Sequence, residues 1–419
     1  MVHNNNNQAV VTSIKLQGSY TSPFVINVDG QPGTNFSNVK IPANDSIYIF
    51  TQVNIDPLNA NNPSLVKDSL VFTTNGNVQW VDLQAYGWNA YYYYPNVFLA
   101  SGPAFSLINA SDSVWKSDKP HVIFGYLVVP PHYRLTVEAG TSIYMHDSAV
   151  IVVDSAATLT MAGNPPPNQV TIQGDRLEPA YKYLPGQWNQ IQLYKTANCR
   201  ISWAVIQNGT TGIQADSSIS TIKIDHTIIK SMSGYGLLAL GATIASDDCL
   251  IADCQYSCLV LYYGGSYTFN QCTFADYWGI YNGYGQRSTA LLQMNNHYQS
   301  ITGQPIYRSM TKAYFGNCII YGPLTEEVTF DSANSSQDIM NYYFQSCVIK
   351  TAHSYPPNHI SNLSLLDPLF ANIPADGYEV NNGSPALGNA YSFISSQYPS
   401  DLADQPRQAS GATIGAYEK

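Results

Sequence analysis

A repeat of 22 to 23 residues in the middle of the chain constrains the fold more than any other feature. Several segments share one form: an apolar residue, two polar residues, a small residue, a variable residue and another apolar residue. Successive segments are 23, 22, 23, 23, 23 and 29 residues apart when the small residues are aligned. A regular period in this range indicates a solenoid. The aligned small residues are Ala204, Thr227, Cys249, Cys272, Asn295, Cys318 and Cys347.

The pattern within each repeat indicates strands rather than helices. Helical repeats run to about 33 to 47 residues and place apolar residues at i, i+3 and i+4. Here the apolar residues have strand-like spacing, and Gly, Asn or Asp separates the runs. Three short strands and three turns fit one coil, and coils stack at about 4.8 Å to bury a shared core. The repeat therefore predicts a right-handed parallel β-helix from Trp115 to Lys350, with a loop inserted around Thr325 to Ser336.

The cysteines fit this register. Four of the seven occupy the small position of their repeats, where a free thiol packs as a small apolar group. Cys249, Cys254 and Cys258 lie close in sequence, but their spacing matches no zinc pattern. We therefore expect a buried stack of reduced thiols and no metal bound by cysteine.

The two ends of the chain lack the repeat. Residues 1–95 alternate in strand fashion between turn signals such as Asp29-Gly30 and Asn75-Gly76, which predicts an immunoglobulin-like β-sandwich. Residues 96–114 are irregular and are predicted to be a linker. The β-helix is assigned to 115–350, and a carboxyl-terminal cap to 351–419.

Composition narrows the function classes. The net charge is −10 with 18 Lys and Arg, so a nucleic-acid partner is not expected. The longest apolar stretches fall short of the roughly 20 residues that span a bilayer, so no transmembrane segment is predicted. Met1 is followed by Val2, His3 and an Asn run rather than by a signal peptide. This start predicts either a cytoplasmic protein or a secretory segment outside this chain.

Motifs near both ends carry a resemblance to a known family. The amino-terminal motifs include Ser22-Pro23-Phe24, Asn27-Val28-Asp29-Gly30 and Asn54-Ile55-Asp56-Pro57. The tail contains Asp367-Pro368-Leu369-Phe370 and Ile414-Gly415-Ala416-Tyr417-Glu418. The chain thus resembles a Bacteroidetes family of surface β-helix proteins that have an amino-terminal immunoglobulin-like module and a "choice-of-anchor Q" tail.

That resemblance implies an extracytoplasmic, lipid-anchored protein at the cell surface or outer membrane. It also implies one more strand before Met1, so the sandwich would lack its first strand. No catalytic residue can be carried over, because the activity of the family is undefined.

An acidic cluster is the candidate catalytic site: Asp225, His226, Asp247 and Asp248, with Asp253 nearby. Asp225 and Asp247 hold the same position of adjacent coils, so they should stack about 5 Å apart, near the separation of a retaining carboxylate pair. Such a pair raises one pKa or attracts a cation such as calcium. Alternatively, aspartates at coil turns cap backbone amides. The Gly-His-Gly and Arg-Ile-Lys signatures of polygalacturonase-like enzymes are absent, which counts against that mechanism.

Aromatic residues form the candidate substrate-binding site. Sugars stack on aromatic rings while polar neighbours bind their hydroxyls; packing of turns explains such a cluster equally well. A third feature, Asp175 and Arg176 with Tyr181 and Trp188, is predicted to brace a loop over the helix. The candidate binding residues are Tyr262, Tyr263, Tyr277, Trp278, Tyr281, Tyr284 and Arg287.

The sequence therefore favours an envelope-associated β-helix protein with a non-enzymatic carbohydrate-binding or structural role. The expected partner is a polysaccharide or cell-surface glycan, and we expect a monomer. No cofactor is predicted, calcium being the ion that the acidic cluster would attract. The alternative is a polysaccharide lyase or glycoside hydrolase that uses the acidic cluster.

Overall fold

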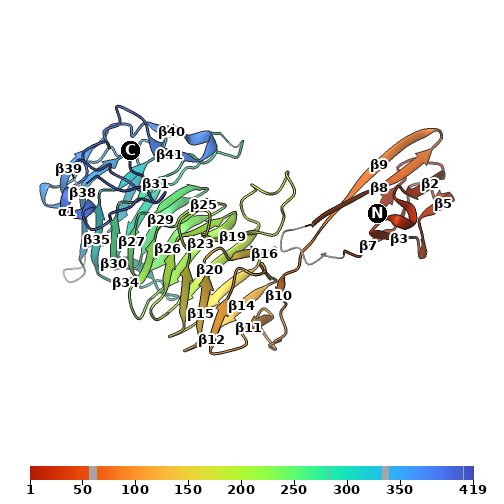
Figure 1. The fold of residues 1–419 in the computed structure, drawn as a ribbon, viewed down its shortest axis with the longest axis horizontal. Helices are drawn as coiled ribbons and strands as arrows, with labels where there is room; N and C mark the ends of the chain where they lie inside the picture. Colours follow the sequence, from red (N-terminus) through yellow and green to blue (C-terminus); the bar gives the residue numbers. More distant parts are fainter. Residues whose placement is uncertain (56–63, 282, 333–338, 409) are drawn as a thin grey trace. The chain divides into compact units, whose positions relative to one another are not determined.

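The computed structural model describes residues 1–55, 64–281, 283–332, 339–408 and 410–419. The chain divides into two compact units, Met1–Ala90 and Tyr91–Lys419. Nearly all of the regular secondary structure in both units is strand (Figure 1). No helix in the described residues is long and apolar enough to cross a membrane.

The first unit consists of antiparallel sheets around one core. Alternate residues such as Ile14, Leu16 and Ile26 point inward and are buried, as the alternating pattern predicts. Asn75 and Gly76 have φ values of 50° and 81°, which suits a tight hairpin turn. The four-stranded sheet has the order β5 (Asn35–Ile41), β2 (Val10–Leu16), β8 (Ser64–Thr74) and β9 (Asn77–Gly87). The smaller sheets are β4 (Gln31–Gly33), β3 (Phe24–Val28) and β7 (Ile49–Val53), and β1 (Val2–His3) with β6 (Ser46–Ile47).

The second unit is a parallel β-helix with three strands per coil. Its strands form three parallel ladders, here called A, B and C in the order in which the chain visits them (Figure 1). Ladder A contains β10 (Tyr91–Tyr93), β13 (His121–Ile123), β16 (Ser142–Met145), β19 (Val170–Gly174), β22 (Ala204–Gln207), β25 (Ile228–Met232), β28 (Leu250–Cys254), β31 (Thr273–Ala275) and β36 (Ile319–Tyr321). Ladder B contains β11 (Phe105–Leu107), β14 (Tyr126–Val129), β17 (Val150–Val153), β20 (Trp188–Tyr194), β23 (Gly209–Asp216), β26 (Tyr235–Leu240), β29 (Ser257–Tyr262), β32 (Leu292–Asn295) and β37 (Val328–Asp331).

Ladders C and A meet at a sharp corner and join in one 19-stranded sheet, which β38 (Met340–Ile349) and β39 (Ile360–Ser364) complete. Ladder C contains β12 (Asp112–Trp115), β15 (Arg134–Glu138), β18 (Thr158–Ala162), β21 (Arg200–Ser202), β24 (Ile222–Asp225), β27 (Thr243–Asp247), β30 (Gly265–Asn270) and β35 (Met310–Gly316).

The corner between ladders C and A explains the small residue of the repeat. In each coil from β21 onward, one residue there adopts the left-handed conformation, for example His226 with φ 45° and Asp248 with φ 50°. The next residue then turns into the core. All seven cysteines are free and buried, and they include the four that the repeat predicts to be buried thiols. From β21 onward, the residues at this corner with positive φ are Trp203, His226, Asp248, Gln271, Asn317, Ser346 and Asn362.

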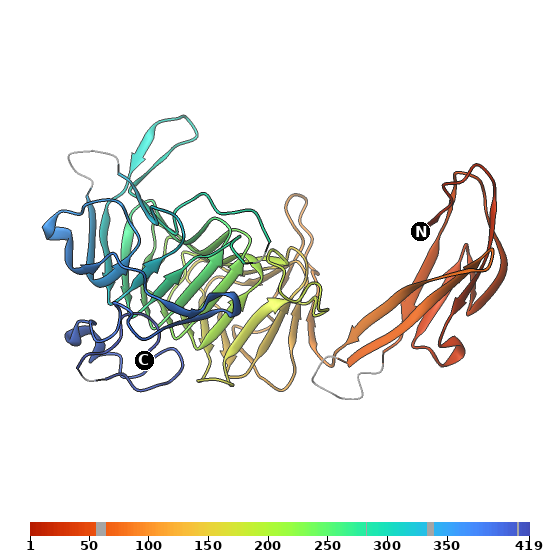
Figure 2. The same cartoon turned by 90° about the horizontal axis from the view of Figure 1, so that it is seen from above.

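The prediction that Asn295 occupies the same position as Cys272 and Cys318 is wrong. Asn295 ends β32 of ladder B, and β30 pairs directly with β35, where Phe269 lies opposite Phe315. One enlarged coil therefore separates the two cysteines. It contains a loop from Asp276 and a projecting hairpin, β33 (His297–Gln299) with β34 (Pro305–Tyr307), seen in cyan in Figure 2.

The predicted boundaries of the β-helix also need correction. Residues 96–114, expected to be a linker, contain β11 and most of β12, which pair with the strands of the next coil. The helix therefore begins at Tyr91, and at its far end β39 extends it beyond Lys350. In the expected loop at Thr325 to Ser336, Val328–Asp331 forms β37 of ladder B. Residues 333–336 of that loop lie outside the described residues.

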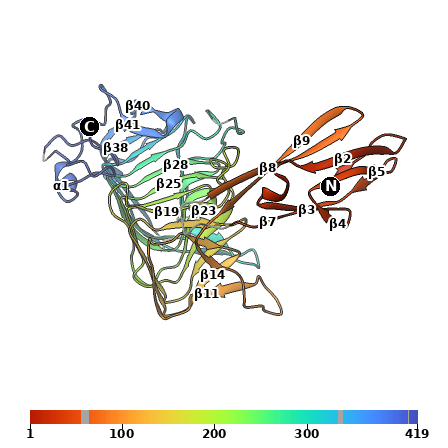
Figure 3. The same ribbon diagram turned by 45° about the vertical axis from the view of Figure 1, so that its right-hand side comes forward.

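The carboxyl-terminal tail covers the outer face of the later strands of ladder A, from β25 onward (Figure 3). It contains β40 (Phe370–Asn372), β41 (Gly377–Val380) and a short helix, α1 (Ser392–Ser395). Outward residues of ladder A, including Leu250, Ala252 and Ile319, pack against Tyr378 and Ile414 of the tail. These strands are apolar on both faces because both faces are buried. The predicted cap is therefore a cover along one flank.

Candidate functional site

Two cavities lie at opposite ends of the ladder A strands, and the tail borders both. The first, of about 520 Å³, is here called the aromatic groove. The second, of about 390 Å³, is here called the acidic corner, and it lies where ladder C turns into ladder A. The groove is lined by Pro179, Ala180, Tyr183, Leu184, Pro185, Ser231, Asp253, Tyr277, Trp278, Tyr281, Tyr284, Ile373, Pro374, Ala375 and Asp376. The acidic corner is lined by Arg200, Lys223, Asp225, His226, Ala245, Asp247, Asp248, Gln397, Tyr398, Pro399 and Ser400.

Four of the candidate binding residues, Tyr277, Trp278, Tyr281 and Tyr284, line the groove and come from the loop after β31. Trp278 is 4% exposed, and its ring stacks on Tyr284 with centroids 5.0 Å apart. Tyr277 packs edge-on against Phe370 of the tail. Tyr281 is 56% exposed. The loop therefore combines packed aromatic rings with one exposed ring, that of Tyr281.

A buried ionic cluster anchors this loop. Arg287 Nε lies 3.2 Å from the Asp276 carboxylate, and Arg287 Nη2 lies 2.7 Å from Glu327. The Asp276 carboxylate also accepts a hydrogen bond from the Trp278 amide. Burial raises the pKa of both acids, and the Arg287 charge opposes that rise. A buried ion pair of this kind fixes geometry, because breaking it strands an unpaired charge.

The structure removes three expected residues from this binding site. The Arg287 side chain is 1% exposed and is paired with both acids, so it cannot contact a glycan. Tyr262 ends β29 of ladder B, where its hydroxyl donates to Gln293. Tyr263 packs 4.8 Å from Tyr298 of the projecting hairpin. Neither tyrosine lines the groove. Tyr262 and Tyr263 were grouped with the groove residues because they are close to them in sequence. That grouping was wrong, because one coil places residues that are close in sequence on different ladders.

The opposite wall of the groove was not predicted from the sequence. It comes from the loop between β19 and β20, where Tyr183 is 72% exposed. This loop is braced as expected: Asp175 binds His146 at 2.6 Å, and the Arg176 guanidinium lies 3.8 Å above the Tyr181 ring. Trp188 is buried. The clustering of tyrosines and prolines in 179–185 was the one available signal.

Carboxylates in the groove are already held by protein partners. Asp253 accepts hydrogen bonds from the Tyr277 amide at 3.1 Å and from the Tyr378 hydroxyl. Asp376 binds Lys230 at 2.6 Å. We expected Asp253 beside the acidic cluster, but it lines the aromatic groove, at the opposite end of the ladder A strands.

The acidic corner brings together the four predicted catalytic residues. Asp225 and Asp247 are register partners on β24 and β27, as the repeat predicts. The Asp225 carboxylate accepts a hydrogen bond from Ser202 and lies 2.9 Å from Arg200. The His226 ring stacks on Trp203 with centroids 4.1 Å apart.

The pKa values of Asp225 and Asp247 move in opposite directions. Burial opposes ionisation of Asp225, but His226, the Ser202 hydroxyl and the Arg200 charge outweigh it and lower its pKa. Burial, and then the charge of Asp225, raise the pKa of Asp247 to about 6. Although burial disfavours the imidazolium, the surrounding carboxylates raise the pKa of His226. Two neighbouring acids whose pKa values are displaced in opposite directions are the arrangement that acid–base catalysis uses.

Asp248 has a structural partner that the sequence did not predict. It is fully buried at the corner, and Arg407 of the tail donates to its Oδ1 atom. The same guanidinium donates to the carbonyls of Gly415 and Ala416 at 3.2 Å. Asp248 therefore fastens the tail to the coil, which makes it unsuited to a free catalytic role.

Comparisons with known proteins add little to this geometry. No family model and no curated protein matches the chain. A solved structure with some likeness is the catalytic domain of a GH87 alpha-1,3-glucanase in complex with nigerose. It is 12% identical, the match covers 82% of this chain and 80% of that one, and the TM-score is 0.18. A likeness at this level carries no argument about fold or activity.

Proposed function

We propose that this protein binds a polysaccharide or cell-surface glycan in the aromatic groove without cleaving it. The observation that carries the proposal is the pairing of exposed Tyr183 and Tyr281 rings with the Trp278–Tyr284 stack around one cavity. Aromatic faces with a few polar neighbours suit sugar rings. Ser231 and Asp376 also line this cavity and place polar side chains beside the aromatic rings.

The absence of a free acid pair favours binding over cleavage in this groove. Of its described lining residues, Asp253 and Asp376 carry carboxylates, and both already have protein partners. A glycosidase requires two carboxyl groups that flank the scissile bond. The groove therefore suits recognition.

We also propose that the first unit is immunoglobulin-like, that the β-helix is right-handed, and that the protein acts as a monomer at the cell surface or outer membrane, held by a lipid anchor. The motif resemblance to the Bacteroidetes surface family supports the location. Antiparallel sheets around one core are consistent with the module. The net charge of −10 argues against a nucleic-acid partner.

A second candidate function is a polysaccharide lyase or glycoside hydrolase that acts at the acidic corner. The observation that favours it is the opposite displacement of the Asp225 and Asp247 pKa values beside an open cavity. Against it stands the engagement of Asp225 with Arg200 and Ser202, which leaves Asp247 as the less encumbered acid.

Affinity electrophoresis through gels that contain neutral or acidic polysaccharides tests the proposal. Wild-type protein should be retarded by at least one glycan, and Tyr281→Ala should lose that retardation. Tyr20→Ala, a change at a 91% exposed tyrosine of the first unit, is the matched control and should migrate as wild type. No retardation on any glycan, or equal retardation of Tyr281→Ala, would contradict binding in the groove.

A turnover assay on the same glycans separates the two candidates. It should follow new reducing ends and the ultraviolet absorbance of unsaturated uronides. Our proposal predicts neither signal. Turnover by wild type that disappears in Asp247→Asn would instead establish the enzyme.

A further inference from the structure

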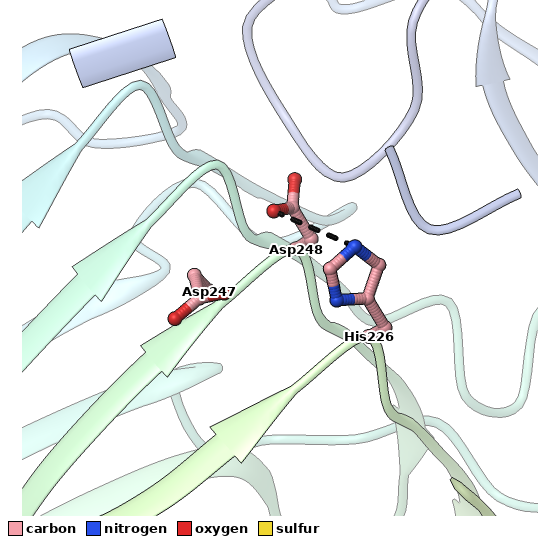
Figure 4. Close-up of side chains that lie close together, drawn as sticks. All are labelled: His226, Asp247 and Asp248. Atoms are coloured by element: carbon pink, nitrogen blue, oxygen red, sulfur yellow. Dashed lines mark ion pairs between the residues drawn. The ribbon is translucent and has the colours of Figure 1, made fainter. Parts of the chain in front are cut away.

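Three side chains at the acidic corner have the arrangement of metal ligands. His226, Asp247 and Asp248 each present one ligand atom, and these atoms lie within 4.8 Å of one another (Figure 4). His226 and Asp248 occupy the left-handed corner position of adjacent coils, and Asp247 ends β27 just before Asp248. The backbone of two stacked coils thus sets the spacing of the three groups.

Two of these groups are buried without a hydrogen-bond partner. Neither ring nitrogen of His226 makes a hydrogen bond, and the same holds for Asp248 Oδ2. The His226 Nε2 to Asp248 Oδ2 distance is 3.9 Å, which is too long for a hydrogen bond. Asp248 is fully buried, and its Oδ2 atom faces His226. An unsatisfied buried carboxylate oxygen costs free energy unless something binds it.

The surroundings hold the three groups in place. Arg407 fixes Asp248 through its Oδ1 atom, which leaves Oδ2 directed at the histidine. Trp203 stacks on the imidazole and sets its plane. None of the hydrogen bonds in the described part of the chain engages the Asp247 carboxylate. Metal sites depend on such outer contacts to orient their ligands.

The local charge favours a cation. The carboxylates are Asp225, Asp247, Asp248 and Glu418, the last being 3.5 Å from Arg407. The basic groups are Arg200, Lys223 and Arg407. With His226 neutral, the carboxylates outnumber the basic groups. Anions are therefore disfavoured at this corner.

We propose that His226, Asp247 and Asp248 bind one divalent transition-metal ion, for which Zn²⁺ is the test ion. One imidazole nitrogen and two carboxylate oxygens suit a first-row transition metal. Ca²⁺ prefers six to eight oxygen ligands, so it should bind this set more weakly. The site lies away from the aromatic groove, so it is independent of glycan binding.

A protonated His226 is the rival explanation for this geometry. An imidazolium between Asp225 and Asp248 would neutralise charge at the corner without any metal, since its nitrogens lie 3.6 Å and 3.9 Å from those carboxylates. The two explanations differ in whether the protein takes up zinc with defined stoichiometry.

Isothermal titration calorimetry of the full chain with Zn²⁺, and separately with Ca²⁺, tests the proposal. The protein is first stripped of metal with EDTA and then dialysed to remove the EDTA. Wild-type protein should bind one Zn²⁺ per chain, and Ca²⁺ at least tenfold more weakly. His226→Asn should lower zinc affinity at least tenfold. Its matched control is His132→Asn, because His132 is exposed and also has a positive φ, 66°. Asparagine tolerates that conformation at both positions.

Asp247→Asn keeps the test decisive if the His226 variant fails to fold. It should also lower zinc affinity at least tenfold, and glycan retardation should be unchanged. The proposal is overturned if wild type binds no zinc stoichiometrically. It is equally overturned if Asp247→Asn binds zinc as tightly as wild type.

Discussion

Replacing Arg407 with alanine should release the tail from the β-helix. The Arg407 side chain is 1% exposed, and it joins buried Asp248 to the carbonyls of Gly415 and Ala416. Removing one partner of a buried ion pair costs about 3–5 kcal/mol, because the other charge stays buried and unpaired. The loss should be local, since the tail packs on the flank of ladder A and not inside the coils.

Amide hydrogen exchange measures this loss directly. The Gly415 amide donates to the Asn317 carbonyl, and the Ala416 amide donates to the Thr273 hydroxyl. At about 1.4 kcal/mol for each tenfold change, these amides should exchange roughly two to nearly four orders of magnitude faster in Arg407→Ala. Amides of ladder B, such as that of Leu259, should exchange at wild-type rates.

The loss of stability caused by Arg407→Ala should depend on pH. Burial raises the pKa of Asp248 to about 7 against the opposing charge of Arg407. Without Arg407 that pKa rises further, so the folded state holds the proton more tightly than the unfolded state does. Folding stability then falls as pH rises. In EDTA, the difference between Arg407→Ala and wild type should therefore be larger at pH 8 than at pH 6.

An exposed pair provides the control. Arg134 and Asp112 lie 3.9 Å apart with side chains 60% and 66% exposed. Such pairs contribute about 0–1 kcal/mol, so Arg134→Ala should leave exchange in the tail unchanged. Tail amides that exchange at the wild-type rate in Arg407→Ala would refute the anchoring role of the Arg407–Asp248 pair.

Three further predictions follow from the core and the acidic corner. Phe315→Ala should lower the free energy of unfolding by about 3–5 kcal/mol, because Phe315 stacks 5.1 Å from both Phe269 and Phe344. Urea denaturation measures this loss, and a shift in the midpoint equivalent to less than about 1 kcal/mol would contradict the prediction. Asp225→Asn should lower the pKa of Asp247 from about 6, because the substitution removes a neighbouring negative charge. Carbon NMR titration in EDTA measures the pKa of Asp247, and an unchanged pKa would contradict the prediction. Native protein should react with a thiol reagent at fewer than one cysteine, and denatured protein at all seven, because the thiols are buried; rapid labelling of native protein would show that the stack is open.

The repeat predicted the ladder neighbours well because each strand of a β-helix pairs at a nearly fixed offset in sequence. That offset placed Asp225 opposite Asp247, and it placed the cysteines at the small corner position. It failed at Asn295, because an inserted loop and hairpin together lengthen one coil by about the length of another. Periodicity counts residues, and it cannot distinguish an insertion of that length from an extra coil.

The contacts of the tail could not be predicted from periodicity. Arg407 and Asp248 are 159 positions apart, and no repeat relates them. The aromatic groove likewise combines the loop after β31, the loop before β20 and the tail. Apolar residues on both faces of ladder A, such as Leu250 with Ile251, are typical of a covered flank, although we did not draw that conclusion from the sequence. They did not identify the segment that covers it.

Glycan binding in the aromatic groove is the central claim, and calorimetric titration with the best-retained glycan tests it most directly. Each lost ring should weaken affinity by about two- to tenfold, from roughly 0.5–1.5 kcal/mol per aromatic contact. Tyr183→Ala with Tyr281→Ala should therefore bind at least several-fold more weakly than wild type, while Asp247→Asn should bind normally. Unchanged affinity in the double variant, or loss of binding in Asp247→Asn, would contradict the claim and move the site to the acidic corner.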